Sequence, residues 1–92
     1  MHTLNPLPAA AERVEVRPMG CDALVHDPVN RKVHVLNASA AEIFALCDGT
    51  RTLEDIASEM SARTGEPRER MLHDVQRALQ QFADLEIIRY SR

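Results

Sequence analysis

The segment from residue 32 to residue 47 changes its spacing of apolar positions from two to about 3.6. Over Lys32–Leu36, Val33 and Val35 fall on one strand face, with Lys32 and His34 on the other. The apolar positions that follow share one side of a helix: Ala40, Ile43, Phe44 and Cys47. We therefore predict a strand over 32–36 that leads directly into a helix.

Two more strands are predicted before this one. Arg13–Arg17 alternates strictly, and we expect Pro18 to stop that strand. Ala23–His26 is a second short strand, and the turn residues of 27–31 follow it, including an Asp-Pro pair and an Asn. The last two strands should form a hairpin, and all three an antiparallel meander.

The helix starts are marked by capping residues. Ser39 and Glu42 fit a capping box at the first helix, with Asn37 as a competing cap, and Asp48-Gly49 fits its end. Thr52 fits the start of a second helix, with Asp55 at its third helical position.

The second helix carries apolar residues at helical spacing from Leu53 to Met60 and should close at Gly65. A third helix follows Pro67, with this apolar stripe: Met71 or Leu72, Val75, Ala78, Leu79 and Phe82. Residues 87–90 fit either a short closing strand or a docked extension. The order of three strands and three helices predicts an α+β fold, a three-stranded antiparallel sheet followed by a three-helix bundle, winged-helix-like.

The 92 residues allow one small domain, which we place at residues 13–92 after a flexible tail at residues 1–12. The longest apolar runs are too short to cross a membrane, and the first residues do not resemble a signal peptide. These features predict a cytoplasmic protein without a membrane partner. Cys21 and Cys47 are expected to be reduced, and the four histidines lack metal-ligand spacing, so no metal or other cofactor is expected.

Enzymatic activity is not expected from this sequence. A nucleophile needs a neighbouring base and an oxyanion site, and the one serine with a marked position, Ser39, is explained as a cap. No Gly-rich phosphate loop and no metalloprotease motif is present.

A winged-helix DNA-binding protein is the alternative function. The third helix carries Arg68, Arg70, His73 and Arg77, as a recognition helix would. However, acidic residues alternate with these cations, and the net charge is −3 with a pI near 5.7. Nucleic acid is therefore an unlikely partner.

Peptide binding is the third class of function. A strand at a sheet edge has unpaired amides and carbonyls that an extended peptide can satisfy as a further strand. A second interpretation stays open on the residues alone: Val33 and Val35 face only the core, and Lys32 and His34 blunt the edge. The same edge would also permit a homodimer by strand exchange.

Several motifs resemble the PqqD family. They are Leu36-Asn37-Ala38-Ser39-Ala40-Ala41-Glu42-Ile43, then Cys47-Asp48-Gly49-Thr50-Arg51-Thr52-Leu53-Glu54-Asp55-Ile56, and later Asp74-Val75 with apolar residues to Phe82. The resemblance covers roughly residues 13–88. It implies a RiPP recognition element, a non-catalytic chaperone that binds the leader of a ribosomally made precursor peptide. Such domains present the leader to a modifying enzyme, a radical SAM protein in pyrroloquinoline quinone biosynthesis.

In this family the leader lies between the third strand and the third helix. Carried onto this sequence, that implies a peptide site formed by Lys32, Val33, His34, Val35, Leu36, Arg68, Leu72, Val75, Arg77 and Leu79. We expect the valines to anchor the strand side, and Arg68, Arg70 and Arg77 to steer an acidic leader. The chain departs from the family at residues 24–29, which leaves open the quinone pathway or a related system with another peptide-modifying enzyme. It also has Glu86 where the family favours Gly, so we expect the chain to leave the third helix without a left-handed residue.

Overall fold

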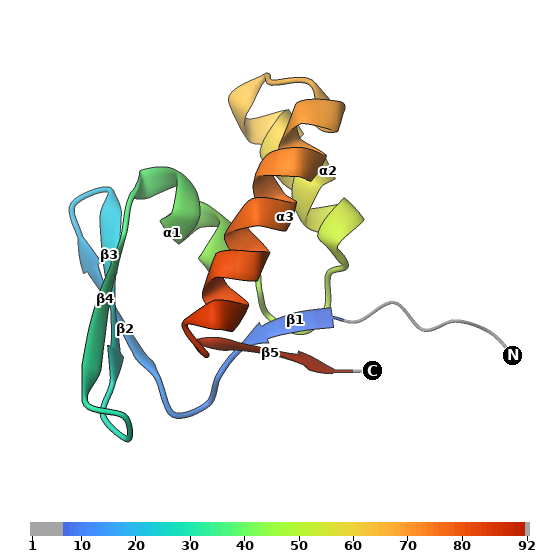
Figure 1. Ribbon diagram of the computed structural model, residues 1–92. Helices are drawn as coiled ribbons and strands as arrows, with labels where there is room; N and C mark the ends of the chain where they lie inside the picture. The colour runs from blue at the N-terminus through green and yellow to red at the C-terminus, as the bar shows by residue number, and fades with distance from the viewer. Residues whose placement is uncertain (1–6, 92) are drawn as a thin grey trace, which may run out of the picture.

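The computed structural model describes residues 7–91 (Figure 1). Three strands form an antiparallel sheet in the order β2-β3-β4, namely β2 (Glu15–Met19), β3 (Asp22–Asp27) and β4 (Lys32–Leu36). Three helices follow, α1 (Ala38–Ala45), α2 (Leu53–Thr64) and α3 (Arg68–Asp84). The predicted α+β fold is confirmed. Within residues 7–91, no helix is long and apolar enough to cross a membrane.

A second, two-stranded sheet joins the two ends of the chain. β1 (Leu7–Ala10) pairs antiparallel with β5 (Ile88–Ser91), and Figure 1 shows them together at the end of α3. The prediction of a tail over residues 1–12 is therefore wrong for residues 7–10, and residues 1–6 lie outside the described residues. Backbone hydrogen bonds to distant segments explain the difference: Ala10 N–H donates to Cys47 C=O at 3.0 Å, and Gly49 N–H donates to Pro8 C=O at 3.0 Å.

β2 continues through Pro18, which pairs with Ala23. The prediction that Pro18 stops this strand is wrong. A proline is accepted in an edge strand when its nitrogen faces away from the neighbouring strand, and β2 is an edge of this sheet.

The helix caps follow local chemistry. Asn37 caps α1, with its Oδ1 accepting a hydrogen bond from Ala40 N–H at 2.9 Å, so the Ser39 capping box is not the one used. As predicted, Thr52 starts α2 and Gly65 closes it with φ +77°. Thr52 and Asp55 also cap the helix reciprocally. α1 ends at Leu46, before the predicted Gly49.

The chain leaves α3 through Glu86, whose φ is +61°. The expectation that it would avoid a left-handed residue here is wrong. A non-glycine residue in this conformation costs about 1 kcal/mol or more, and compensation comes from neighbouring hydrogen bonds. Ile87 N–H donates to Phe82 C=O at 3.0 Å, and the carbonyl of Glu86 accepts from Arg13.

One aliphatic core holds the sheet and the helices together. Phe44 of α1 and Phe82 of α3 meet edge to face, with ring centroids 5.3 Å apart. Around this pair lie the other large buried side chains: Val25, Leu36, Ile43, Ile56, Met60, Met71, Val75, Leu79, Ile87 and Ile88. The core covers one face of the three-stranded sheet and leaves the other face to solvent.

Candidate functional site

β4 has an open edge. It pairs with β3 on one side, and no other strand within residues 7–91 pairs with its second side. β1 pairs with β5 and not with β4. The backbone groups along this edge are therefore accessible to another extended chain.

Pro18 shows which backbone groups of β4 face that edge. Proline has no N–H, so its pair with Ala23 is a non-hydrogen-bonded pair, and the backbone of Pro18 points away from β3. The two residues of a non-hydrogen-bonded pair direct their backbone groups away from each other, so Ala23 directs its N–H and C=O to β4, where it pairs with Leu36. The direction of these groups reverses at each successive residue of a strand. The same alternation directs the N–H and C=O of Val33 and Val35 to the open edge.

The side chains of Val33 and Val35 lie on the outer face of the sheet and are 56% and 62% exposed. The inner face, which carries Ala23, Val25 and Leu36, packs against α1 and the rest of the core. The predicted alternation along β4 is confirmed. The interpretation in which both valines face only the core is wrong, because α1 covers the face that Leu36 occupies.

His34 lies on the inner face beside the open edge. Its side chain is half-buried, and its Nε2 is shielded from solvent and finds no hydrogen-bond partner among the described residues. Lys32 shares this face but stays exposed, at the start of the strand. Within residues 7–91, His34 is thus a partly buried side chain beside the open edge whose shielded Nε2 has no hydrogen-bond partner.

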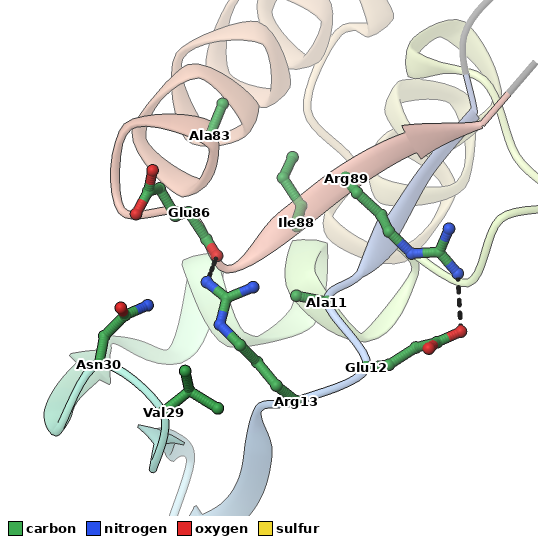
Figure 2. Close-up of a pocket in the computed structure, with 9 residues that line it drawn as sticks. All are labelled: Ala11, Glu12, Arg13, Val29, Asn30, Ala83, Glu86, Ile88 and Arg89. Carbon is green, nitrogen blue, oxygen red and sulfur yellow. Dashed lines mark hydrogen bonds and ion pairs between the residues drawn. The ribbon is translucent and has the colours of Figure 1, made fainter.

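Two hollows lie at the two ends of β4, and α3 lines both. The hairpin hollow, of about 790 Å³, begins just before Lys32 and is shown in Figure 2. Its lining residues are Ala11, Glu12, Arg13, Val29, Asn30, Ala83, Glu86, Ile88 and Arg89. The helix hollow, of about 440 Å³, begins just after Leu36 and is lined by Asn37, Ser39, Ala40, Ile43, Asp74, Arg77, Ala78 and Gln81.

The helix hollow continues toward α2. A third hollow of about 280 Å³ shares Ser39, Ile43 and Asp74 with it and adds Met60, Met71 and Arg70, among others. A depression thus runs from the end of β4 along α1 and α3, with Ile43 as an apolar residue in its floor.

One stripe of α3 faces the helix hollow. Asp74, Arg77, Ala78 and Gln81 follow the spacing i, i+3, i+4 and i+7, which places them on one side of a helix. Ala78 is half-buried and small, while Arg77 and Gln81 are exposed. This stripe is a wall of mixed polarity beside the end of the open strand.

The α3 residues predicted from the sequence to form this wall differ from those that line it. Val75 and Leu79 are buried in the core, at 0% and 2% exposure, so they support the wall from behind rather than line it. Leu72 lines none of the three hollows and lies about 200° around the helix from Asp74. Of the predicted site residues on α3, Arg77 lines the helix hollow, and Arg70, predicted to steer the leader, lines the third hollow.

The other arginines of α3 are engaged with neighbouring side chains. Arg68 donates from Nε to Ser58 Oγ of α2 at 2.8 Å. Arg70 lies 3.6 Å from Glu66 and 4.0 Å from Asp74. These contacts mix positive and negative charge along the helix and do not form the basic surface that duplex DNA requires.

The residues that line the helix hollow but were not predicted as site residues share a pattern in the sequence. Asp74 and Gln81 flank the apolar stripe of α3 on one side, Ala78 belongs to that stripe, and Asn37 and Ser39 are predicted only as caps. A stripe of small and polar residues beside a core stripe is a general feature of a partly covered helix. It identifies a wall only when the facing element is known.

The two cysteines are free and differ in environment. Cys21 is exposed at the β2–β3 turn, whereas Cys47 is buried after α1. Burial raises the pKa of the Cys47 thiol to about 12, and its Sγ donates to Ile43 C=O at 3.3 Å. Cys47 is thus a core residue, and Cys21 is a convenient labelling position.

Comparisons with known proteins agree with this architecture. A family model described as "Coenzyme PQQ synthesis protein D (PqqD)" matches residues 22–88. A "PqqA binding protein" from Bradyrhizobium diazoefficiens is 40% identical over 45 residues, which are 49% of this chain and 44% of that relative. The match therefore spans less than half of the relative's length.

A solved structure shares the fold. The structure titled "TbiB1 in Complex with the TbiA(beta) Leader Peptide" superposes with a TM-score of 0.78 at 16% sequence identity. The match covers 87% of this chain and 93% of that one. Nearly all of both chains therefore follow the same path.

Proposed function

This chain belongs to the PqqD family, and from that membership we propose that it is a non-catalytic peptide chaperone. It binds the leader segment of a ribosomally made precursor by strand addition at β4 and presents the precursor to a modifying enzyme. The observation that carries this proposal is the open edge of β4, with Val33 and Val35 directing their backbone groups to solvent.

Strand addition would divide the guest residues into two sets. Guest residues opposite Val33 and Val35 share the exposed outer face of the sheet with these valines. The intervening guest residues point inward, toward His34 and the stripe of α3 that contains Ala78 and Arg77. The guest is therefore expected to alternate between an apolar contact outside and a mixed contact inside.

The backbone of β4 supplies affinity, and the two side-chain contacts supply specificity. Two residues with free N–H and C=O groups allow up to four ladder hydrogen bonds, each contributing about 1 kcal/mol. Two or three buried guest side chains add about 1.5–3 kcal/mol each before the cost of ordering the peptide. A micromolar Kd requires about 8 kcal/mol, so this edge is sufficient for a guest of moderate affinity.

The names of the relatives support a precursor peptide as the guest. One relative is named for binding PqqA, and the structure with the shared fold is titled as a leader-peptide complex. We therefore propose PqqA or a related precursor as the guest, and a radical SAM protein or another peptide-modifying enzyme as the recipient, in the cytoplasm. A second copy of the chain would compete for the same edge, which makes a homodimer an alternative state to the complex.

Amide NMR titration tests this function directly. The probes are a synthetic Bradyrhizobium PqqA peptide and the TbiA(beta) leader, with a scrambled version of each as control. We expect shifts at Val33 and Val35 together with Ala78 and Gln81, while α2 stays unchanged. Shifts confined to α2, or no saturable shift with either peptide, would overturn the proposal. A duplex DNA titration in parallel should give no response that falls steeply with salt.

A further inference from the structure

Arg13 links two segments that lie far apart in the sequence. Its Nε donates to both carboxylate oxygens of Asp27, at 3.2 and 3.1 Å, and its Nη2 donates to the carbonyl of Glu86, 73 residues away. Asp27 is the last residue of β3, and Glu86 follows α3. One side chain therefore ties the hairpin to the end of the helix.

The Asp27 end of this link is fixed to β4. Asp27 is 1% exposed, and its carboxylate also accepts hydrogen bonds from Asn30 N–H at 3.1 Å and Asn30 Nδ2 at 2.8 Å. The hydrogen bonds from Asn30 and then Arg13 hold the pKa of Asp27 below its usual value, despite the opposing effect of burial. Asp27 pairs with Lys32, the first residue of β4, so strand pairing connects the hairpin turn to the start of the open strand.

The Glu86 end is equally constrained. Its backbone is left-handed with φ +61°. Its carbonyl shares a peptide plane with Ile87 N–H, which donates to Phe82 C=O at 3.0 Å, and this hydrogen bond fixes the direction of the carbonyl. Figure 2 shows the Arg13 side chain lying between Glu86 on one side and the Val29–Asn30 turn on the other. These segments belong to the two walls of the hairpin hollow, and Arg13 connects them.

We propose that Arg13 is a positioning residue for the guest peptide, holding the first half of β4 at a fixed spacing from the end of α3. It acts through Asp27 and the carbonyl of Glu86, and in this role it keeps the hairpin end of the site open to a defined width. This inference rests on the proposed function, because the spacing matters for binding only if a guest lies along β4.

The test compares Arg13→Met and Arg13→Lys with a matched control, Arg63→Met. Arg63 also joins two elements, with Glu42 of α1 at 3.6 Å and Glu59 of α2 at 3.2 Å, but it lines none of the three hollows. Each variant is titrated with the PqqA and TbiA(beta) leader peptides, and its amide hydrogen exchange is measured without peptide.

For Arg13→Met we expect the Kd for the binding leader to rise about tenfold, because the guest must then order a strand end that is no longer held at one spacing from α3. Exchange should become faster at Asn30 and Ile87, while the amides of α2 keep their protection. Arg13→Lys should fall between Arg13→Met and the unsubstituted chain, because an ammonium cannot reach both partners with the geometry of a guanidinium. Arg63→Met should leave the Kd within about twofold.

Two results would overturn the inference. One is a Kd for Arg13→Met equal to that of Arg63→Met. The other is faster exchange spread evenly over α2 and the hairpin, which indicates general destabilisation rather than local positioning. If no leader binds the unsubstituted chain, the proposed function fails, whereas the exchange pattern still decides whether Arg13 holds the hairpin to α3.

Discussion

The two edges of the three-stranded sheet look similar in composition but differ in their backbone. On β2, Val16 and Met19 are each 49% exposed, and on β4, Val33 and Val35 are exposed to a similar extent. The difference is Pro18, which removes a donor from the outward side of β2, whereas β4 keeps its outward donors at both valines. Exposed apolar side chains therefore do not distinguish the two edges, whereas the backbone donors do, and they favour β4 as the proposed binding edge.

The surroundings of the two edges differ as well. β4 lies between the hairpin hollow and the helix hollow, and both contain residues of α3. No β2 residue lines any of the three hollows described here. A guest on β4 meets a helix on its inner side, whereas a guest on β2 would gain only main-chain pairing. Two features therefore favour β4 over β2 as the edge for a guest: the outward backbone donors and the neighbouring wall formed by α3.

Proline substitutions along β4 should give the largest effect in this comparison. His34 directs its N–H toward β3, so His34→Pro breaks the ladder and should lower the free energy of unfolding by about 3 kcal/mol. Val35→Pro should change it by less than about 1 kcal/mol, as the native Pro18 already shows for β2. Urea unfolding measures both variants. Equal losses would show that the assignment of outward groups is wrong.

Peptide affinity should fall strongly with Val35→Pro, the substitution that is expected to change folding stability little. Val35→Pro removes a donor that faces the guest and leaves a guest carbonyl unsatisfied, so the Kd for the leader should rise about 30-fold or more. Val35→Thr keeps the donor and the β-branched shape and should change the Kd by a smaller factor. Calorimetric titration checks both variants, and an unchanged Kd for Val35→Pro would exclude strand addition at this position.

Low pH should weaken the hydrogen bonds of Asp27 that hold the start of β4. The folded pKa of Asp27 is lowered from its ordinary 3.8, chiefly by the hydrogen bond from Asn30. Its stabilising contribution is therefore complete above about pH 4 and is lost as the pH falls through the lower, folded pKa. Asp27→Asn should flatten the acid limb of a stability profile measured by urea unfolding. An acid limb of the same slope in this variant would assign the effect to other carboxylates, such as Asp48.

Restoring the donor on β2 should give the smallest effect. Pro18→Val supplies the missing N–H but no helical wall, so we expect a second leader site whose Kd is at least about tenfold weaker than that of β4. The stoichiometry of a calorimetric titration would rise above one at high peptide concentration. A second site as tight as the first would mean that α3 contributes little to binding.

A label at Cys21 sharpens the same comparison without changing either edge. Cys21 is exposed at the turn before β3, near the Ala23–Leu36 end of the sheet, while Cys47 is buried. A spin label there should broaden the guest residues that lie beside Leu36 more than those beside Lys32. The broadening pattern gives the direction of the bound strand.

Much of the fold was encoded in local patterns of the sequence. The period-two run of Lys32–Leu36 predicted the bounds of β4, and Thr52 and Gly65 predicted the two ends of α2. These signals act between residues a few positions apart, so they persist whatever the rest of the chain does. The family motifs, which lie mostly between residues 36 and 56, likewise indicated peptide binding before any contact was known.

Other features were decided only by contacts between distant segments. The pattern of β4 defines two faces but not which one α1 covers, and that choice left Val33 and Val35 exposed and buried Leu36. The pairing of β1 with β5 and the link from Arg13 to Glu86 join residues more than 70 positions apart. Periodicity along one segment carries no information about its partner, so the open edge and its wall exist only in the assembled structure.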